Sequence, residues 1–168
     1  NPEEVIKDEA KSMMLNLIAF ADLRVDDVMV PRADIIAIED KATMRDLLER
    51  LTEANHSRLP VYRETLDDLT GMIHVKDFVR WMTVKGAASK KKAVKAAGLS
   101  LSAVDLGQTV KQSNLMRELL FVPPSMPATD LLVKMQSTHI HMAIVVDEYG
   151  GTDGLVSIED LVEEIVGD

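Results

Sequence analysis

The chain has 168 residues, of which 46% are hydrophobic and 28% charged, so it is long enough for one compact domain or two small ones that share a core. It contains no cysteine, which excludes disulfide frameworks, thiolate zinc sites and cysteine nucleophiles. Its formal net charge of -9 repels phosphate backbones, so nucleic acid is a poor candidate partner.

The first predicted element is an amphipathic helix over residues 3–21, with apolar side chains at helical spacing such as Met13, Leu17 and Ile18. No run of the sequence approaches the roughly 18 apolar residues that a membrane-spanning helix needs, and no signal peptide is visible. Because the chain begins with Asn1, we expect a piece of a longer protein. The expected location is cytoplasmic, in the soluble part of a protein that can itself be membrane-associated.

An internal repeat organises the rest of the chain. The triplet Asp-Leu-Leu occurs at 46–48 and again at 130–132. After the loss of one residue the correspondence continues, so that Gly71 recurs as Gly154. Matches at spaced positions, in the same order and with a single gap, indicate a duplicated unit.

Both copies are predicted to run strand, helix, strand, strand, helix. In the first copy the elements span residues 35–38, 43–54, 59–62, 69–74 and 75–82, with Thr43 as a helix N-cap and a turn at Asp67-Asp68. In the second copy they span residues 119–122, 127–138, 142–147, 154–157 and 158–166, with a hairpin turn at Gly150-Gly151. The predicted fold class is α+β (α/β), with two β-α-β-β-α repeats that pack about a pseudo-two-fold axis after an N-terminal amphipathic helix.

The predicted division of the chain is an N-terminal helix over 1–24, a first repeat over 25–82, a basic linker over 83–112 and a second repeat over 113–168. The linker lacks acidic residues up to Val104 and contains Lys85, Lys90, Lys91, Lys92 and Lys95. We interpret this stretch as a solvated connection. Contact with lipid headgroups is the alternative.

The start of the last predicted helix offers chemistry for a nucleotide. The Ser157 hydroxyl and the first backbone amides of the helix suit a phosphate, because these groups have no intrahelical partner. The Asp160 carboxylate, in the first turn, can accept hydrogen bonds from the two vicinal hydroxyls of a ribose. The structural alternative is that Ser157 caps the helix and Asp160 complements its dipole.

Each repeat ends in a glycine, two apolar residues, one residue that is polar, two further residues and an aspartate, at 71–77 and 154–160. This motif resembles that of the cystathionine-beta-synthase (CBS) domain, and the paired copies resemble a Bateman module. Three further segments, at 28–34, 57–62 and 146–156, resemble the CorC/HlyC family of magnesium and cobalt efflux or hemolysin-like proteins. The resemblance covers residues 5–168.

The resemblance implies a regulatory module that binds AMP or ATP, with or without Mg²⁺, between the two repeats. The residues it assigns to this site are Asp34, Ile35, Ile36, His56, Ser57, Arg58, Leu59, Pro60, His141, Ser157 and Asp160. A weaker second site would contain Val122, His74 and Asp77, where His74 replaces the usual serine or threonine. The resemblance also implies a homodimer, and a membrane or transporter domain in the full-length protein.

Other functions are weighed against this one. His139 and His141 would alternate along a strand and, with Asp147 or Glu148, would suit zinc. No third ligand at a motif spacing accompanies the two histidines, so we interpret them as core or cleft residues and predict no resident metal. The acidic residues Glu159, Glu163 and Glu164 would suit a magnesium sensor, but we prefer to interpret them as a solvated helix face. A dimerisation module without ligand is the third alternative. No nucleophile elbow, P-loop lysine or dinucleotide fingerprint is present, so we predict no enzyme.

Overall fold

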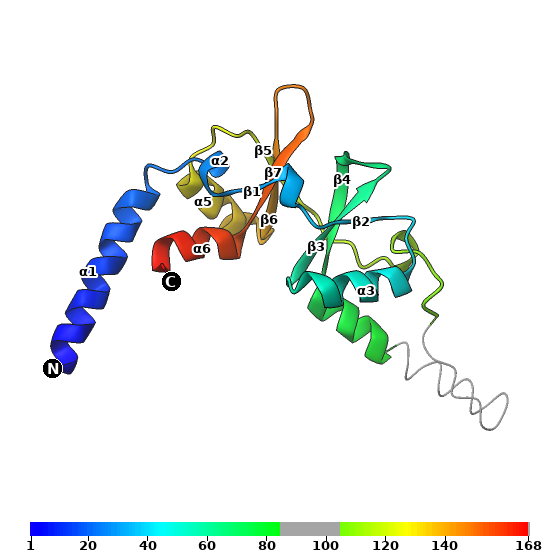
Figure 1. Ribbon diagram of the computed structural model, residues 1–168, viewed down its shortest axis with the longest axis horizontal. Coiled ribbons are helices and arrows are strands. Elements are labelled where there is room, and N and C mark those ends of the chain that lie inside the picture. Colours follow the sequence, from blue (N-terminus) through cyan, green and yellow to red (C-terminus); the bar gives the residue numbers. More distant parts are fainter. Residues whose placement is uncertain (85–104, 168) are drawn as a thin grey trace. The chain divides into compact units, whose positions relative to one another are not determined.

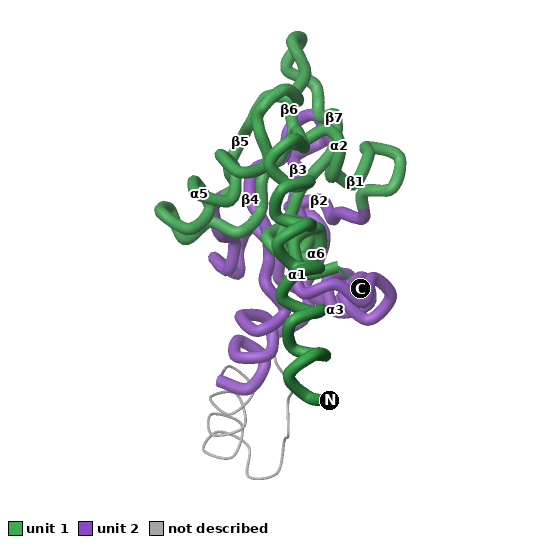
Figure 2. Tube along the Cα trace, turned by 90° about the vertical axis from the view of Figure 1, so that its left-hand side faces the viewer, with its two compact units in different colours: residues 1–35, 119–168 green, residues 36–118 purple. Residues whose placement is uncertain are grey.

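The computed structural model describes residues 1–84 and 105–167 (Figure 1). The five linker lysines named above, and with them the predicted solvated connection and its lipid-contact alternative, lie outside the described residues. The chain divides into two compact units, coloured separately in Figure 2. Unit 1 comprises Asn1–Ile35 and Leu119–Asp168, and unit 2 comprises Ile36–Glu118.

Unit 1 is built on a four-stranded sheet in the order β1-β7-β6-β5. Strand β5 runs parallel to β6, whereas β7 is antiparallel to both of its neighbours. Its elements are α1 (Pro2–Phe20), α2 (Val25–Val28), β1 (Val30–Pro31), the short 3-10 helix η1 (Arg32–Asp34), β5 (Leu120–Val122), α5 (Ala128–Thr138), β6 (Met142–Val146), β7 (Thr152–Ser157) and α6 (Ile158–Val166).

Unit 2 is built on a three-stranded sheet in the order β2-β3-β4, with β2 parallel to β3 and β4 antiparallel to it. Its elements are β2 (Ile38–Glu39), α3 (Met44–Ala54), β3 (Arg58–Arg63), β4 (Thr65–His74), a helix that includes residues 75–84, and η2 (Lys111–Ser113). Thr43 begins α3 as predicted, because its Oγ1 accepts from the Asp46 N–H (3.1 Å) and the Asp46 carboxylate accepts from the Thr43 N–H (3.0 Å).

The predicted α+β class is confirmed, with the N-terminal helix and the order strand, helix, strand, strand, helix in both repeats. The packing of the repeats about a pseudo-two-fold axis stays a prediction. Two local predictions for the first repeat are wrong. The strand predicted at 35–38 is reduced to Ile38–Glu39. The turn predicted at Asp67-Asp68 lies instead at Glu64, whose φ of 66° reverses the chain, and both aspartates belong to β4.

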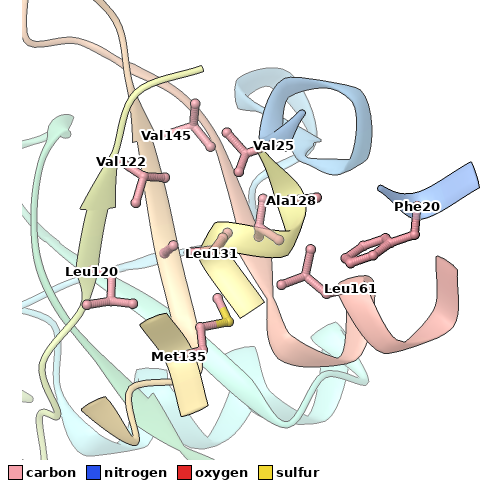
Figure 3. Close-up of a cluster of buried hydrophobic side chains, with 11 residues drawn as sticks. Phe20, Val25, Leu120, Val122, Ala128, Leu131, Met135, Val145 and Leu161 are labelled. Carbon is pink, nitrogen blue, oxygen red and sulfur yellow. The ribbon is translucent and has the colours of Figure 1, made fainter. Parts of the chain in front are cut away.

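A single hydrophobic core holds unit 1 together. Figure 3 shows Leu131 and Met135 of α5 packed against the sheet, with Leu161 of α6 beside them. The Phe20 ring, at the end of α1, points at Leu161 and is 2% exposed. Burial of this ring holds the end of α1 against α6, because it removes a large apolar surface from water.

The opening segment of each repeat, ahead of its first predicted strand, packs against the sheet of the other repeat. In unit 1 Pro31 pairs with Gly154, where an added Cβ would lie 2.5 Å from the Val30 carbonyl oxygen. In unit 2 Met72 and Arg117 exchange backbone hydrogen bonds of 3.0 and 2.8 Å. The compact units therefore cut the chain at 35/36 and 118/119, and not where the sequence repeats begin.

Candidate functional site

The start of α6 in unit 1 carries the strongest predicted pair of residues. Ser157 is the N-cap, and its Oγ accepts from the Asp160 N–H at 3.3 Å. In return, Asp160 Oδ2 accepts from the Ser157 N–H at 2.9 Å. This reciprocal capping box confirms the structural role that the sequence offered for both residues. It also fixes both side chains, which are half-buried, at a helix end that attracts negative charge.

His141 lies beside this helix start. Its carbonyl oxygen accepts from the Ile158 N–H, the first amide of α6, at 2.9 Å. The neighbouring residue Met142 pairs with Ser157 across β6 and β7. The structure therefore brings His141, Ser157 and Asp160 together, three residues that the sequence assigns to one nucleotide site.

The entry segment, residues 28–35, is held in unit 1 by contacts with β7, the strand that ends at Ser157. Strand β1 pairs with β7, and the following residue, Arg32, donates from Nη1 to the Thr152 carbonyl oxygen at 3.1 Å. Asp34 is exposed in η1, and Ile35 caps this short helix. Sequence reasoning did not single out Arg32 as an anchor of this segment.

Unit 2 repeats the arrangement with different side chains. The Ser57 carbonyl oxygen accepts from the Val75 N–H at 2.9 Å, the counterpart of the bond between His141 and Ile158. Arg58 pairs with His74 across β3 and β4. Both repeats therefore have the same hydrogen bond, which joins the residue before the second strand of the repeat to the first amide of its closing helix.

His74 occupies the position of Ser157 and also caps its helix, because its Nδ1 accepts from the Lys76 N–H at 3.0 Å. The imidazole is buried, with 8% exposed. Burial, followed by the positive charges of Arg58 and Arg117, lowers the pKa of His74 below its ordinary 6.5. The imidazole is therefore favoured in its neutral form, whose Nδ1 can accept the hydrogen bond from the Lys76 N–H.

Asp77 occupies the position of Asp160 but is held by a cation. Arg117 donates from Nε to Asp77 Oδ2 at 2.6 Å and from Nη2 to Oδ1 at 2.8 Å. This bidentate bond lowers the pKa of Asp77 below 3.8. Sequence reasoning missed Arg117. The one available signal for this segment was that the pair Leu115-Met116, just before Arg117, matches the pair Val28-Met29 near the start of the first repeat.

Some predicted site residues have side chains that serve the cores. Leu59 packs in the core of unit 2 and Val122 in that of unit 1, and Pro60 is also buried. Only backbone groups of Leu59 and Val122 can face a ligand. By contrast, His56 and Ser57 are exposed and Arg58 is half-buried.

The predicted nucleotide residues divide between the units. Asp34, Ile35, His141, Ser157 and Asp160 belong to unit 1, and Ile36 and 56–60 belong to unit 2. The structure groups residues within each unit as described above. That both groups surround one nucleotide stays a prediction.

The zinc alternative loses its geometric basis. His139 ends α5 in the left-handed conformation, with a φ of 59°, and β6 begins only at Met142. The two histidines therefore do not alternate along a strand. Within 1–84 and 105–167, no three His, Asp or Glu residues form a group able to hold a metal ion. Over the same residues, no helix combines the length and the apolar character needed to cross a bilayer.

Comparisons with known proteins identify the family. The model of the CBS domain matches residues 25–84 and 113–167. The chain is 40% identical over 168 residues to the possible hemolysin C of Rickettsia akari and to the hemolysin C of Rickettsia prowazekii, and it spans about half the length of each (48%).

Solved structures agree with the sequence matches. The CBS domain of a bacterial CNNM/CorC family Mg²⁺ transporter has a TM-score of 0.76 and 37% identity, over 95% of this chain and 85% of that one. The same kind of domain in complex with ATP gives 0.75 and 36%, over 95% and 98%. A CBS-domain pair from Klebsiella pneumoniae with bound AMP gives 0.65 and 32%, over 87% and 100%. The chain is a CBS domain pair and belongs to the CorC/hemolysin C family.

Proposed function

We propose that this CBS pair is a regulatory module that binds one adenine nucleotide, AMP or ATP, the latter together with Mg²⁺. The observation that carries the proposal is the start of α6, where Ser157, Asp160 and His141 lie together. Related CBS structures described as complexes with ATP and with AMP support it.

In this proposal each group has a distinct task. Asp160 Oδ2 holds the Ser157 amide, and we assign Oδ1 to the ribose hydroxyls. The Ser157 hydroxyl and the helix start face phosphate, helped by the His141 side chain. The adenine lies against the remaining predicted residues, Asp34, Ile35, Ile36, His56, Ser57, Arg58, Leu59 and Pro60. Arg58 compensates phosphate charge that the acidic chain opposes.

The counterpart site built on His74, Asp77 and Val122 is assigned a weak role or none. Both carboxylate oxygens of Asp77 already accept from Arg117. A ribose would have to compete with this bidentate guanidinium for the same two oxygens of Asp77. We therefore expect one nucleotide per chain.

Regulation requires that the nucleotide bind one conformation better than another. Phe20 of α1 packs on Leu161, one residue after Asp160 (Figure 3). We propose that nucleotide binding at the start of α6 is transmitted through this contact to α1, and from there to neighbouring domains of the full-length protein. A non-catalytic role, a homodimer, a cytoplasmic location and coupling to a membrane transporter domain belong to the same proposal.

Calorimetric titration of the 168-residue chain with AMP, ADP and ATP, each with and without Mg²⁺, tests the proposal. We expect saturable binding with one nucleotide per chain. Asp160→Asn keeps the size of the side chain but removes its charge, and should weaken binding about tenfold or more, as expected when a hydrogen bond to a charged group is lost.

Asp130→Asn is the matched control, because Asp130 is an exposed aspartate in the first turn of α5. It should leave the affinity unchanged. Circular dichroism must show that both variants keep their helices. Absence of binding by all three nucleotides, or equal affinity in Asp160→Asn and Asp130→Asn, contradicts the proposal.

A further inference from the structure

A pocket lies wholly within unit 2, where the β3–β4 hairpin faces the segment 111–116. It encloses about 330 Å³, at the lower end of the range for small-molecule sites. Its lining residues are Asp40, Arg63, Thr70, Lys111, Asn114 and Met116, none of which the sequence assigns to the nucleotide.

Asp40 is the buried group of this pocket. Its backbone is fixed on both sides, because its N–H donates to the Tyr62 carbonyl (2.8 Å) and its carbonyl accepts from the Lys111 N–H (3.0 Å). The residue is 5% exposed, and within the described residues its Oδ1 has no hydrogen-bond partner. A buried carboxylate oxygen without a donor costs free energy. Oδ1 itself is closed to solvent, so a ligand would contact Asp40 through the part of the residue that lines the pocket.

The charges around the pocket define what such a ligand must carry. Arg63 donates from Nε to Asp68 Oδ2 at 2.8 Å, and the negative charges of Asp68 and Asp40 both stabilise its guanidinium. Lys111 is exposed on the rim and brings a second positive charge. The pocket therefore offers a negative group in its buried part and a positive group at its rim. Two cations in the lining disfavour a metal ion.

We propose that this pocket binds a free α-amino acid, with the ammonium group on Asp40 and the carboxylate on Lys111. A zwitterion matches both charges at once, and charge-assisted hydrogen bonds are the strongest that a small site can offer. Thr70 and Asn114 provide polar contacts for the rest of the ligand. The proposal shares no residue with the nucleotide site, so either one can fail without the other.

Titration of the isotope-labelled 168-residue chain, followed by amide chemical shifts, tests this site. The probes are glycine, L-alanine, L-serine and L-glutamate, each alone, with acetate and methylammonium as half-ligands. At least one amino acid should shift the amides of Asp40, Arg63 and Lys111 saturably, whereas acetate and methylammonium should not. Asp40→Asn and Lys111→Met should each weaken binding about tenfold or more.

Matched controls come from the exposed face of α3 in the same unit. Glu49→Gln removes a negative charge and Arg50→Met a positive one, and neither residue lines the pocket. Both should bind as the unchanged chain does. Lack of saturable shifts with every amino acid, equal binding of acetate alone, or unchanged affinity in Lys111→Met overturns the proposal. Lys111→Met tests it even if Asp40→Asn does not fold.

Discussion

Asp77 and Asp160 occupy the same place in the two repeats, but different groups hold them. Asp160 accepts a backbone amide of its own helix start, whereas Asp77 accepts a guanidinium from forty residues away. Only 14% of the Asp77 side chain is exposed, so the carboxylate side of its ion pair with Arg117 is shielded from solvent.

Arg117→Met should free Asp77 from this pair. We expect the pKa of Asp77 to rise towards 3.8 and the free energy of unfolding at neutral pH to fall by about 1 kcal/mol. The sign follows from linkage: a depressed carboxyl pKa stabilises the fold above 3.8, and this contribution is lost as pH falls through the lowered pKa. Carboxyl chemical shifts and urea unfolding measure the two effects. Arg24→Met, which removes a more exposed ion pair with Asp26, is the control, and an equal loss there would refute a special role for Arg117.

His74 makes unit 2 sensitive to acid. Its pKa is lowered by burial, so the unfolded chain takes up a proton at a pH where the folded chain does not. The free energy of unfolding should therefore fall as pH drops below 6.5. His74→Ser keeps a helix cap without a titrating group and should flatten this part of the profile, measured by urea unfolding between about pH 8 and about pH 5. If His56→Gln, a change at an exposed histidine, flattens it equally, the assignment to His74 is wrong.

Among the elements, the strands β1 and β2 are the shortest, with two residues each. Strand β1 pairs only with β7, where Gly154 allows close approach. In Gly154→Ala the new Cβ would lie 2.5 Å from the Val30 carbonyl oxygen and 2.7 Å from Met29 Sδ. We expect a loss of about 2 kcal/mol in the free energy of unfolding, because the pairing must open or shift.

Urea unfolding measures this loss, and Gly150→Asn is the control. Gly150 has a φ of 82°, a Cβ added there would have no atom within 4 Å, and asparagine tolerates this conformation. The control should change stability by less than about 1 kcal/mol. Equal stability of Gly154→Ala and the unchanged chain would show that β1 does not need this close approach.

Across the chain as a whole, the repeats and the compact units are different divisions of the same sequence. The segment that opens the first repeat belongs to unit 1, and the segment around Arg117, which opens the second repeat, belongs to unit 2. Each unit therefore contains the opening segment of the other repeat. Asp34 and Ile36, two of the residues proposed to contact the nucleotide, belong to different units.

Features that depend on neighbours along the chain were predictable from the residues alone. Helical spacing predicted α3, α5 and α6. Thr43 was predicted as an N-cap and Ser157 was offered as one in the structural alternative, and both could be identified because their partners lie three residues away. The duplicated Gly-to-Asp motif indicated the family, which the comparisons confirm. The turn at Glu64 escaped prediction because glutamate carries no preference for the left-handed conformation.

The long-range partners of the polar groups, by contrast, are set only when the chain is folded. The bond of Arg117 to Asp77, the pairing of β1 with β7 and the burial of Asp40 beside Lys111 each join segments far apart in the chain. Such contacts depend on how the strands pair and which faces become covered, and no periodicity in the sequence encodes them. Local hydrogen bonding therefore specified the two similar repeats, whereas long-range packing made their sites different.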